Sequence, residues 1–207
     1  MEEQNDLLLE QDEKQYPEKW LKIGVNVGIF GALFGILPQV ANFTPDAKEL
    51  DEVLSPILDV VSFIGDAAFT IVEAIFLYLI TCKMKSNNMQ KPSVLLFYIL
   101  IASSCLAFFE GPFDDVVIIG FIYLAMLLIT GFSCLSISEM KKLGISMLLL
   151  PVGAIISMII LEANNHIHSK GEFILTILPY MAAVIFYLES CSKFLKSSKP
   201  KEVPALD

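Results

Sequence analysis

Residues 66–81, DAAFTIVEAIFLYLIT, decide the fold, because they are almost entirely apolar and belong to a longer apolar run, Leu58–Thr81. That run is long enough to cross the roughly 30 Å of hydrocarbon in a lipid bilayer as one α-helix. Two acids interrupt it, Asp66 and Glu73, and Asp59 lies seven residues before the first of them. A step of seven residues on an α-helix returns to nearly the same face and rises about 10.5 Å.

This spacing predicts a ladder of carboxyl groups down one face of the helix, which is the candidate pathway for protons or cations. A Ser-Pro pair at 55–56 predicts that the helix begins there. If the helix reaches the cytoplasmic edge at Thr81, Glu73 lies near the middle of the bilayer. Asp66 then lies in the outer half and Asp59 at the outer interface. An ionised side chain at the bilayer centre costs about 3 kcal/mol or more, so such an acid marks a functional site by default.

The whole chain has the composition of a membrane protein, with 207 residues, 55% of them hydrophobic, and a mean hydropathy of +0.66. A membrane-spanning helix needs about 20 apolar residues. Six runs of about that length are present, so we expect an all-α protein with six transmembrane helices in one bundle. The six predicted spans are Leu21–Ala41, Leu58–Thr81, Ser93–Phe109, Val116–Ile137, Ile145–Leu161 and Phe173–Leu188.

The lysines predict the orientation of this bundle. The chain has no arginine, and all but two of its 14 positively charged residues lie before or at the start of the first span, after the last, or in the connections that follow the second and fourth spans. The two exceptions are Lys48 and Lys170. Because an excess of lysine marks the cytoplasmic side, both termini are expected in the cytoplasm. We therefore expect an acidic cytoplasmic arm at 1–19, the six-helix domain at 20–190 and a lysine-rich cytoplasmic tail at 191–207.

The first span carries a stripe of glycines, Gly24, Gly28, Gly31 and Gly35, at spacings of four, three and four residues. Small residues at these spacings lie on one side of a helix and let another helix approach closely in a membrane. The stripe predicts a tight helix contact, either within the chain or across a homodimer.

No lysine or histidine falls at the predicted depth of Glu73, so the sequence offers this carboxyl no salt-bridge partner. Three states stay open: the carboxyl is protonated, it is hydrogen-bonded to polar residues of neighbouring spans, or it binds a cation. A purely structural role, in which a neutral acid joins helices, also stays open. The polar residues considered as partners are Asn26, Ser103, Ser104, Tyr123 and Thr130.

The outer loops are acidic and contribute to the net charge of −9. Such a surface concentrates cations at the mouth of any pathway beneath it. Because topology keeps lysines on the inner side, acidic outer loops also arise without any such role. The residues predicted at the outer acidic mouth are Glu52, Glu110, Asp114 and Asp115.

Glu162, His166 and His168 form a candidate metal site, because the two rings of His-x-His point the same way in extended chain. Two histidines in a short polar loop can equally face solvent. The sequence has no CxxC pair, and its four cysteines lie in or beside the spans. Neither a disulfide, a thiolate metal site nor a cofactor is therefore expected.

The sequence gives no support for catalysis, since it lacks HExxH, a GxSG serine motif with a membrane histidine, and a phosphate-cradling glycine loop. Nucleic-acid binding is not expected either, because the cytoplasmic lysines are sparse and the N-terminal arm is acidic. We expect a multi-pass membrane protein, in the cell membrane if the host is bacterial, whose immediate partner is the lipid bilayer.

The function that this pattern favours is the handling of protons or cations, including metal cations, by a small transporter or channel. The carboxyl ladder would form the pathway, and the small size suggests a homo-oligomer or a subunit of a membrane complex. The alternative is a non-transporting interaction protein, such as an immunity, assembly or regulatory subunit. In that case the buried acids only specify which helices pair.

Overall fold

The computed structural model describes residues 17–41, 51–87, 91–110, 117–164 and 170–197, which form six α-helices and one short 3-10 helix. No strand occurs within these ranges, so the expected all-α fold is confirmed. The elements are α2 (Glu18–Ala41), α3 (Asp51–Ser86), α4 (Lys91–Glu110), α5 (Val117–Leu135), η2 (Ser138–Met140), α6 (Lys141–Asn164) and α7 (Lys170–Lys196).

Helix length and composition are those of a multi-pass membrane protein. Four helices are long and apolar enough to cross a membrane, with segments at Glu18–Ile36, Pro56–Ser86, Ser138–Leu161 and Ile174–Lys196. The apolar parts of α4 and α5 are shorter, at Ser93–Phe108 and Gly120–Leu135. Sixteen helical residues rise only about 24 Å, which is less than the hydrocarbon thickness of a typical bilayer. The count of six spans therefore stays a prediction.

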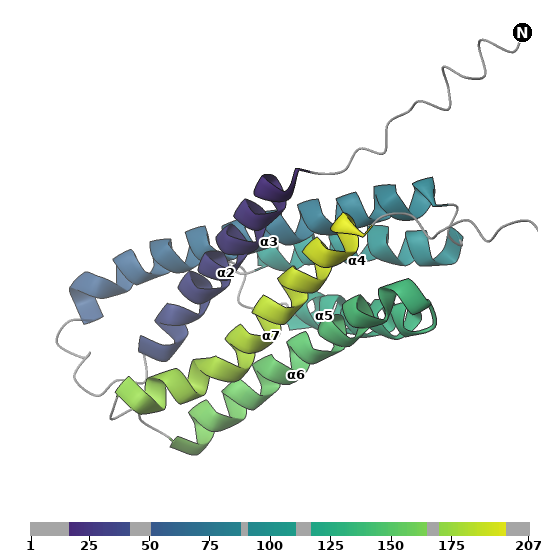
Figure 1. Cartoon of the computed structure of the whole chain (residues 1–207). Coiled ribbons are helices and arrows are strands. Elements are labelled where there is room, and N and C mark those ends of the chain that lie inside the picture. Colours follow the sequence, from purple (N-terminus) through teal and green to yellow (C-terminus); the bar gives the residue numbers. More distant parts are fainter. Residues whose placement is uncertain (1–16, 42–50, 88–90, 111–116, 165–169, 198–207) are drawn as a thin grey trace, which may run out of the picture.

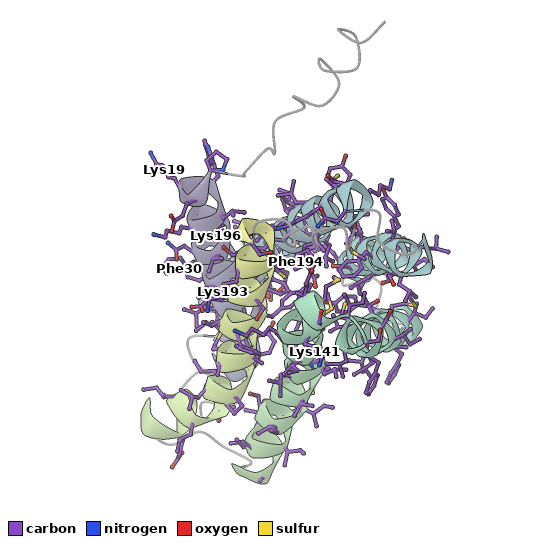
Figure 2. All side chains as sticks on the ribbon, turned by 45° about the vertical axis from the view of Figure 1, so that its right-hand side comes forward. Lys19, Phe30, Lys141, Lys193, Phe194 and Lys196 are labelled. Carbon is purple, nitrogen blue, oxygen red and sulfur yellow. The ribbon has the colours of Figure 1, made fainter. Side chains whose placement is uncertain are left out.

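The six helices form a closed ring, because each packs against the next along the chain and α7 packs back against α2 (Figure 1). α3 and α7 also contact each other across the ring. Apolar side chains cover the outside of the ring as well as its core: Phe30, Ile71, Phe121 and Ile159 are all exposed. Figure 2 shows Phe30 on the outer side of α2. Helices that are apolar all round belong in a lipid environment.

The glycine stripe of α2 lies in contacts within the chain. A Cβ added at Gly31 would lie 2.7 Å from the backbone N of Phe69 and 2.8 Å from the carbonyl O of Gly65. Gly65 of α3 is equally close to α2, because a Cβ added there would lie 2.7 Å from the carbonyl O of Gly31. Gly24, Gly28 and Gly35 likewise face side chains of α3, and Gly28 also faces α7. The two backbones approach so closely that only glycine fits at this crossing.

The lysine-bearing ends of the helices lie together at one end of the bundle, called the lysine end below. Lys83 of α3 caps the end of α7, since its Nζ donates to the carbonyl oxygens of Phe194, at 2.6 Å, and Leu195, at 3.2 Å. Lys196 of α7 pairs with Glu18 of α2 at 3.1 Å. Figure 2 shows Lys19, Lys193 and Lys196 where α2 begins and α7 ends. A lysine near the last carbonyls of a helix also interacts favourably with the helix dipole.

The start of α3 differs from the one expected. α3 begins at Asp51 and runs without interruption through Pro56, instead of starting at the Ser-Pro pair. Pro56 is the sixth residue of α3, beyond the first turn, so it removes the backbone hydrogen bond to the carbonyl of residue 52, and the helix continues in spite of that cost. α7 continues to Lys196 and thus includes part of the segment expected as a tail from 191. The rest of the expected terminal segments, at 1–16 and 198–207, lies outside the described residues.

The close α2–α3 crossing predicts a measurable cost for a single methyl group. We expect Gly31→Ala to lower the free energy of unfolding by about 1–3 kcal/mol, because rigid backbone atoms must move apart. Gly120→Ala is the matched control, because a Cβ there meets nothing within 4 Å. That control should be neutral or slightly stabilising, since alanine is the better helix former. Thermal unfolding in detergent micelles, followed by circular dichroism, measures both, and equal stability of the two variants would contradict the predicted close contact.

Candidate functional site

Glu73 lies inside the ring of helices, with only 1% of its surface exposed. Three hydroxyl groups from three other helices donate hydrogen bonds to its carboxyl group. Ser104 Oγ of α4 donates to Oε2 at 2.5 Å. Tyr123 OH of α5 and Tyr187 OH of α7 donate to Oε1 at 2.8 and 3.1 Å. One carboxyl group on α3 thus joins four of the six helices.

Among the described residues, the surroundings of Glu73 are polar, and no ion pair includes its carboxyl group. The ion pairs formed within the described helices join Glu18 to Lys22 and Lys196, and Glu189 to Lys193, all on the surface. A buried carboxylate without a cation is costly, and hydroxyl donors reduce that cost only in part. A hydroxyl can donate to a carboxylate and can also accept from a carboxylic acid. These partners can therefore serve both protonation states of the carboxyl group.

Asp66 lies one heptad from Glu73 on α3 and keeps an exposed side chain. Ser62 Oγ is 3.3 Å from Asp66 Oδ2 and also donates to the carbonyl O of Gly35 at 3.1 Å. Tyr180 of α7 lines a pocket together with Asp66 and precedes by one heptad Tyr187, which bonds to Glu73. Tyr180 therefore links the environments of the two acids.

The tyrosines of α7 repeat the spacing of the acids of α3. Tyr180 and Tyr187 are seven residues apart, as are Asp66 and Glu73. α3 and α7 run in the same direction and contact each other, so equal heptad steps keep the two pairs at matching depth (Figure 1). Each acid of α3 thus has a tyrosine of α7 in its surroundings.

A pocket of about 190 Å³ opens beside Asp66, in the half of the bundle away from the lysine end. Its polar atoms come from Asp66, Ser157, Thr176 and Tyr180. The Tyr180 backbone N–H, next to Pro179, donates to Ser157 Oγ at 3.2 Å and ties α7 to α6. The rest of the lining is apolar or glycine: Ala32, Gly35 and Ile36 of α2, and Ala154, Met158 and Leu161 of α6.

On the other side of Glu73, towards the lysine end, Thr130 carries a hydroxyl without a partner. Its Oγ1 is buried and makes no hydrogen bond within the described residues. Thr130 follows Tyr123 by seven residues on α5, which places it one heptad beyond the tyrosine that binds Glu73. Polar groups therefore occur on both sides of Glu73 along the bundle.

The other predicted site residues are placed only in part. Asp59 is exposed on α3. The side chains of Glu52, Glu110 and Glu162 are not described, and Asp114, Asp115, His166 and His168 lie outside the described residues. No cluster of three or more metal-binding side chains occurs in the part of the chain that is described. The acidic mouth and the Glu162–His166–His168 metal site stay predictions.

Two of the five polar residues considered as partners of Glu73, Ser104 and Tyr123, are hydrogen-bonded to it. Asn26 is exposed, while Ser103 donates to the carbonyl O of Leu100 in its own helix. Sequence reasoning missed Tyr187. The signal was present, because the Tyr180–Tyr187 spacing matches that of the acids, but nothing local in the sequence says that α3 and α7 are neighbours.

Comparison with known proteins adds no function to this site. No protein-family model matches the chain, and no similar protein was found among curated sequences or solved structures. The interpretation of the site therefore rests on its residues and their geometry.

Oε1 of Glu73 accepts hydrogen bonds from two tyrosines, whereas Oε2 accepts one from Ser104. Loss of the serine hydroxyl should therefore destabilise the protein more than loss of one tyrosine hydroxyl. Ser104→Ala should lower the free energy of unfolding by about 1–3 kcal/mol, because Oε2 loses its hydroxyl donor. Tyr187→Phe should cost less, since Tyr123 still donates to Oε1. Ser103→Ala is the matched control, because its hydroxyl bonds only within α4. Thermal unfolding of all three variants in micelles tests the order, and a Ser103→Ala variant as unstable as Ser104→Ala would refute it.

Proposed function

We propose that this protein moves or senses protons or a small cation across a membrane, with Glu73 as the central proton-binding group. The observation that carries the proposal is a carboxyl group inside an apolar bundle whose hydrogen-bond partners are three neutral hydroxyls. A group in this setting can bind and release a proton without breaking an ion pair. Buried acids of this kind in membrane helices are typical of proton relays and ion pathways.

The polar groups on either side of Glu73 support a pathway through the bundle. Asp66 and Tyr180 line the pocket on one side, and Thr130 carries its unpartnered hydroxyl on the other. In the proposed pathway, Asp59 and Asp66 exchange the proton or cation with the outer side. Hydroxyls of Tyr123, Tyr187 and Thr130 then relay a proton from Glu73 towards the lysine end.

We propose that all six helices span the bilayer, with both termini in the cytoplasm. Lys83, Lys85, Lys193 and Lys196 lie at one end of the bundle, where Lys83 contacts the end of α7 and Lys196 pairs with Glu18 at the start of α2. An excess of lysine at one end supports placing that end in the cytoplasm. The small size supports assembly as a homo-oligomer or with other membrane subunits.

The flux prediction uses purified protein in liposomes that contain a pH-sensitive dye. Wild type should carry protons or a cation when a gradient is imposed, and Glu73→Gln should reduce that flux about 100-fold or more, by removing the proton-binding group. Glu139→Gln is the matched control, since Glu139 is exposed at the lysine end, and it should retain wild-type flux. Absence of flux from wild type under every cation and pH gradient would refute the proposal.

The same hydrogen bonds also favour a second function, that of an interaction protein, because a carboxyl group that joins four helices specifies which helices pair. In that case the protein is a non-transporting interaction partner in a membrane complex. Glu73→Gln would then keep its partner in a pull-down, and deletion of residues 1–15 would release it. A transporter shows the reverse pattern, with flux lost in the first variant and retained in the second.

The orientation is tested with reporters fused to the chain in a bacterial host. Green fluorescent protein at the C-terminus should fluoresce and alkaline phosphatase there should be inactive, because the first folds in the cytoplasm and the second outside it. The same phosphatase fused after residue 115, in the predicted outer loop, should be active. An active phosphatase at the C-terminus would contradict the predicted even number of spans or their orientation.

A further inference from the structure

We propose that the pocket beside Asp66 binds a small organic monocation, such as an alkylammonium or arylalkylammonium ion, with the Asp66 carboxylate as its counter-ion. The inference names the class of cation for the function proposed above and rests on that function for transport. Binding of the cation is argued from the pocket alone and does not depend on transport.

The size of the pocket excludes a tight fit to a bare metal ion. Its volume is about 190 Å³. A protein cavity of about 150 Å³ is large enough to hold benzene. The pocket therefore fits a molecule of roughly the size of a small aromatic ring with one short substituent.

The lining supports an organic cation over a metal cation. A dehydrated calcium ion takes about six to eight oxygen ligands, and a hydrated metal ion needs polar walls. Here Ile36, Met158 and Leu161 present apolar side chains. Thr176 already donates its hydroxyl to the Glu172 carbonyl at 2.9 Å. One carboxylate in an otherwise largely apolar pocket suits an ammonium group that carries hydrocarbon.

Asp66 has room for such a partner. Its hydrogen bond from Ser62 is long, at 3.3 Å, and none of the ion pairs of the described helices includes it. Its carboxylate is exposed and lines the pocket, so its oxygen atoms can accept from an ammonium group. Tyr180 adds an aromatic side chain to the wall of the same pocket, and aromatic rings attract organic cations through their faces.

The space exists because small residues face it. Ala32 and Gly35 of α2 and Ala154 of α6 line the pocket, whereas larger residues at these positions would fill it. A Cβ added at Gly35 would collide with the Asp66 carboxylate. The same glycine that lets α2 approach α3 therefore leaves the carboxylate free to face the pocket.

The test measures binding of benzylammonium to the purified full-length protein in lipid nanodiscs by isothermal titration calorimetry at pH 7. Benzyl alcohol is the matched ligand, because it has nearly the same shape without the charge. We expect saturable binding of benzylammonium, and binding of benzyl alcohol weaker by about tenfold or more, since only the cation pairs with a carboxylate in a pocket of low dielectric constant. Equal binding of the two ligands, or no saturable binding of benzylammonium, overturns the inference.

Variants locate the binding site. Asp66→Asn should weaken benzylammonium binding about tenfold or more, and Glu139→Gln, which changes an exposed acid at the lysine end, should leave it unchanged. Ala154→Leu should abolish binding by filling the pocket, which keeps the inference testable if Asp66→Asn does not fold. Equal losses in Asp66→Asn and Glu139→Gln, or full binding by folded Ala154→Leu, contradict it.

The two proposals fail separately. Glu73→Gln should still bind benzylammonium while it loses proton flux. Glu73-dependent flux in a protein that does not bind benzylammonium would overturn the organic-cation inference alone. Binding without any flux would overturn the transport proposal and leave the ligand site standing.

Discussion

A carboxyl group held inside an apolar bundle is the constraint on which the rest of this structure depends. Glu73 is buried, and its neighbours offer hydroxyl donors instead of a cation. An unsatisfied buried carboxyl group would cost more free energy than most single contacts supply, so its partners cannot be exchanged freely. Because those partners come from α4, α5 and α7, this single requirement fixes how three helices are turned towards α3. Hydrophobic contacts alone would leave such rotations poorly determined, since these helices are apolar on nearly every side.

Small residues set the distances at which this arrangement is possible. Gly31 and Gly65 bring the backbones of α2 and α3 together, and Gly131 meets Gly144 where α5 crosses α6. A Cβ at Gly153 of α6 would lie 2.7 Å from the Pro179 carbonyl O, so α6 and α7 also approach closely. Packing of this kind supplies the attraction that the hydrophobic effect cannot supply between helices in lipid. Close crossings and a nearby pocket are compatible because contacts at the crossings hold the helices in place while small side chains beside them leave space.

Much of the fold follows from local sequence signals, and less of the site does. Each of the six apolar runs coincides with one helix, because a long apolar run favours a helix whatever its neighbours are. The heptad spacing that relates Asp66 to Glu73 is local as well. Tyr187 and the pocket depend instead on which faces of α2, α3, α6 and α7 meet, and one sequence carries no direct signal for that. At the start of α3 the local signal misled: the Ser-Pro pair at 55–56 indicates a helix start, but the helix begins earlier, at Asp51, and continues through Pro56.

In the proposed function, the two acids of α3 would do different work. Asp66 is exposed in a pocket and can pair with a ligand, whereas Glu73 is closed off by hydroxyls and can exchange only something as small as a proton. One heptad separates them, and two unit charges about 10.5 Å apart interact by roughly 1.6 kcal/mol at an effective dielectric constant of 20. A cation at Asp66 and a proton at Glu73 therefore repel each other, and by linkage each weakens binding of the other to the same extent. In the proposed function, this coupling would favour exchange of one against the other. Tyr180 lines the pocket beside Asp66, one heptad before Tyr187, which binds Glu73.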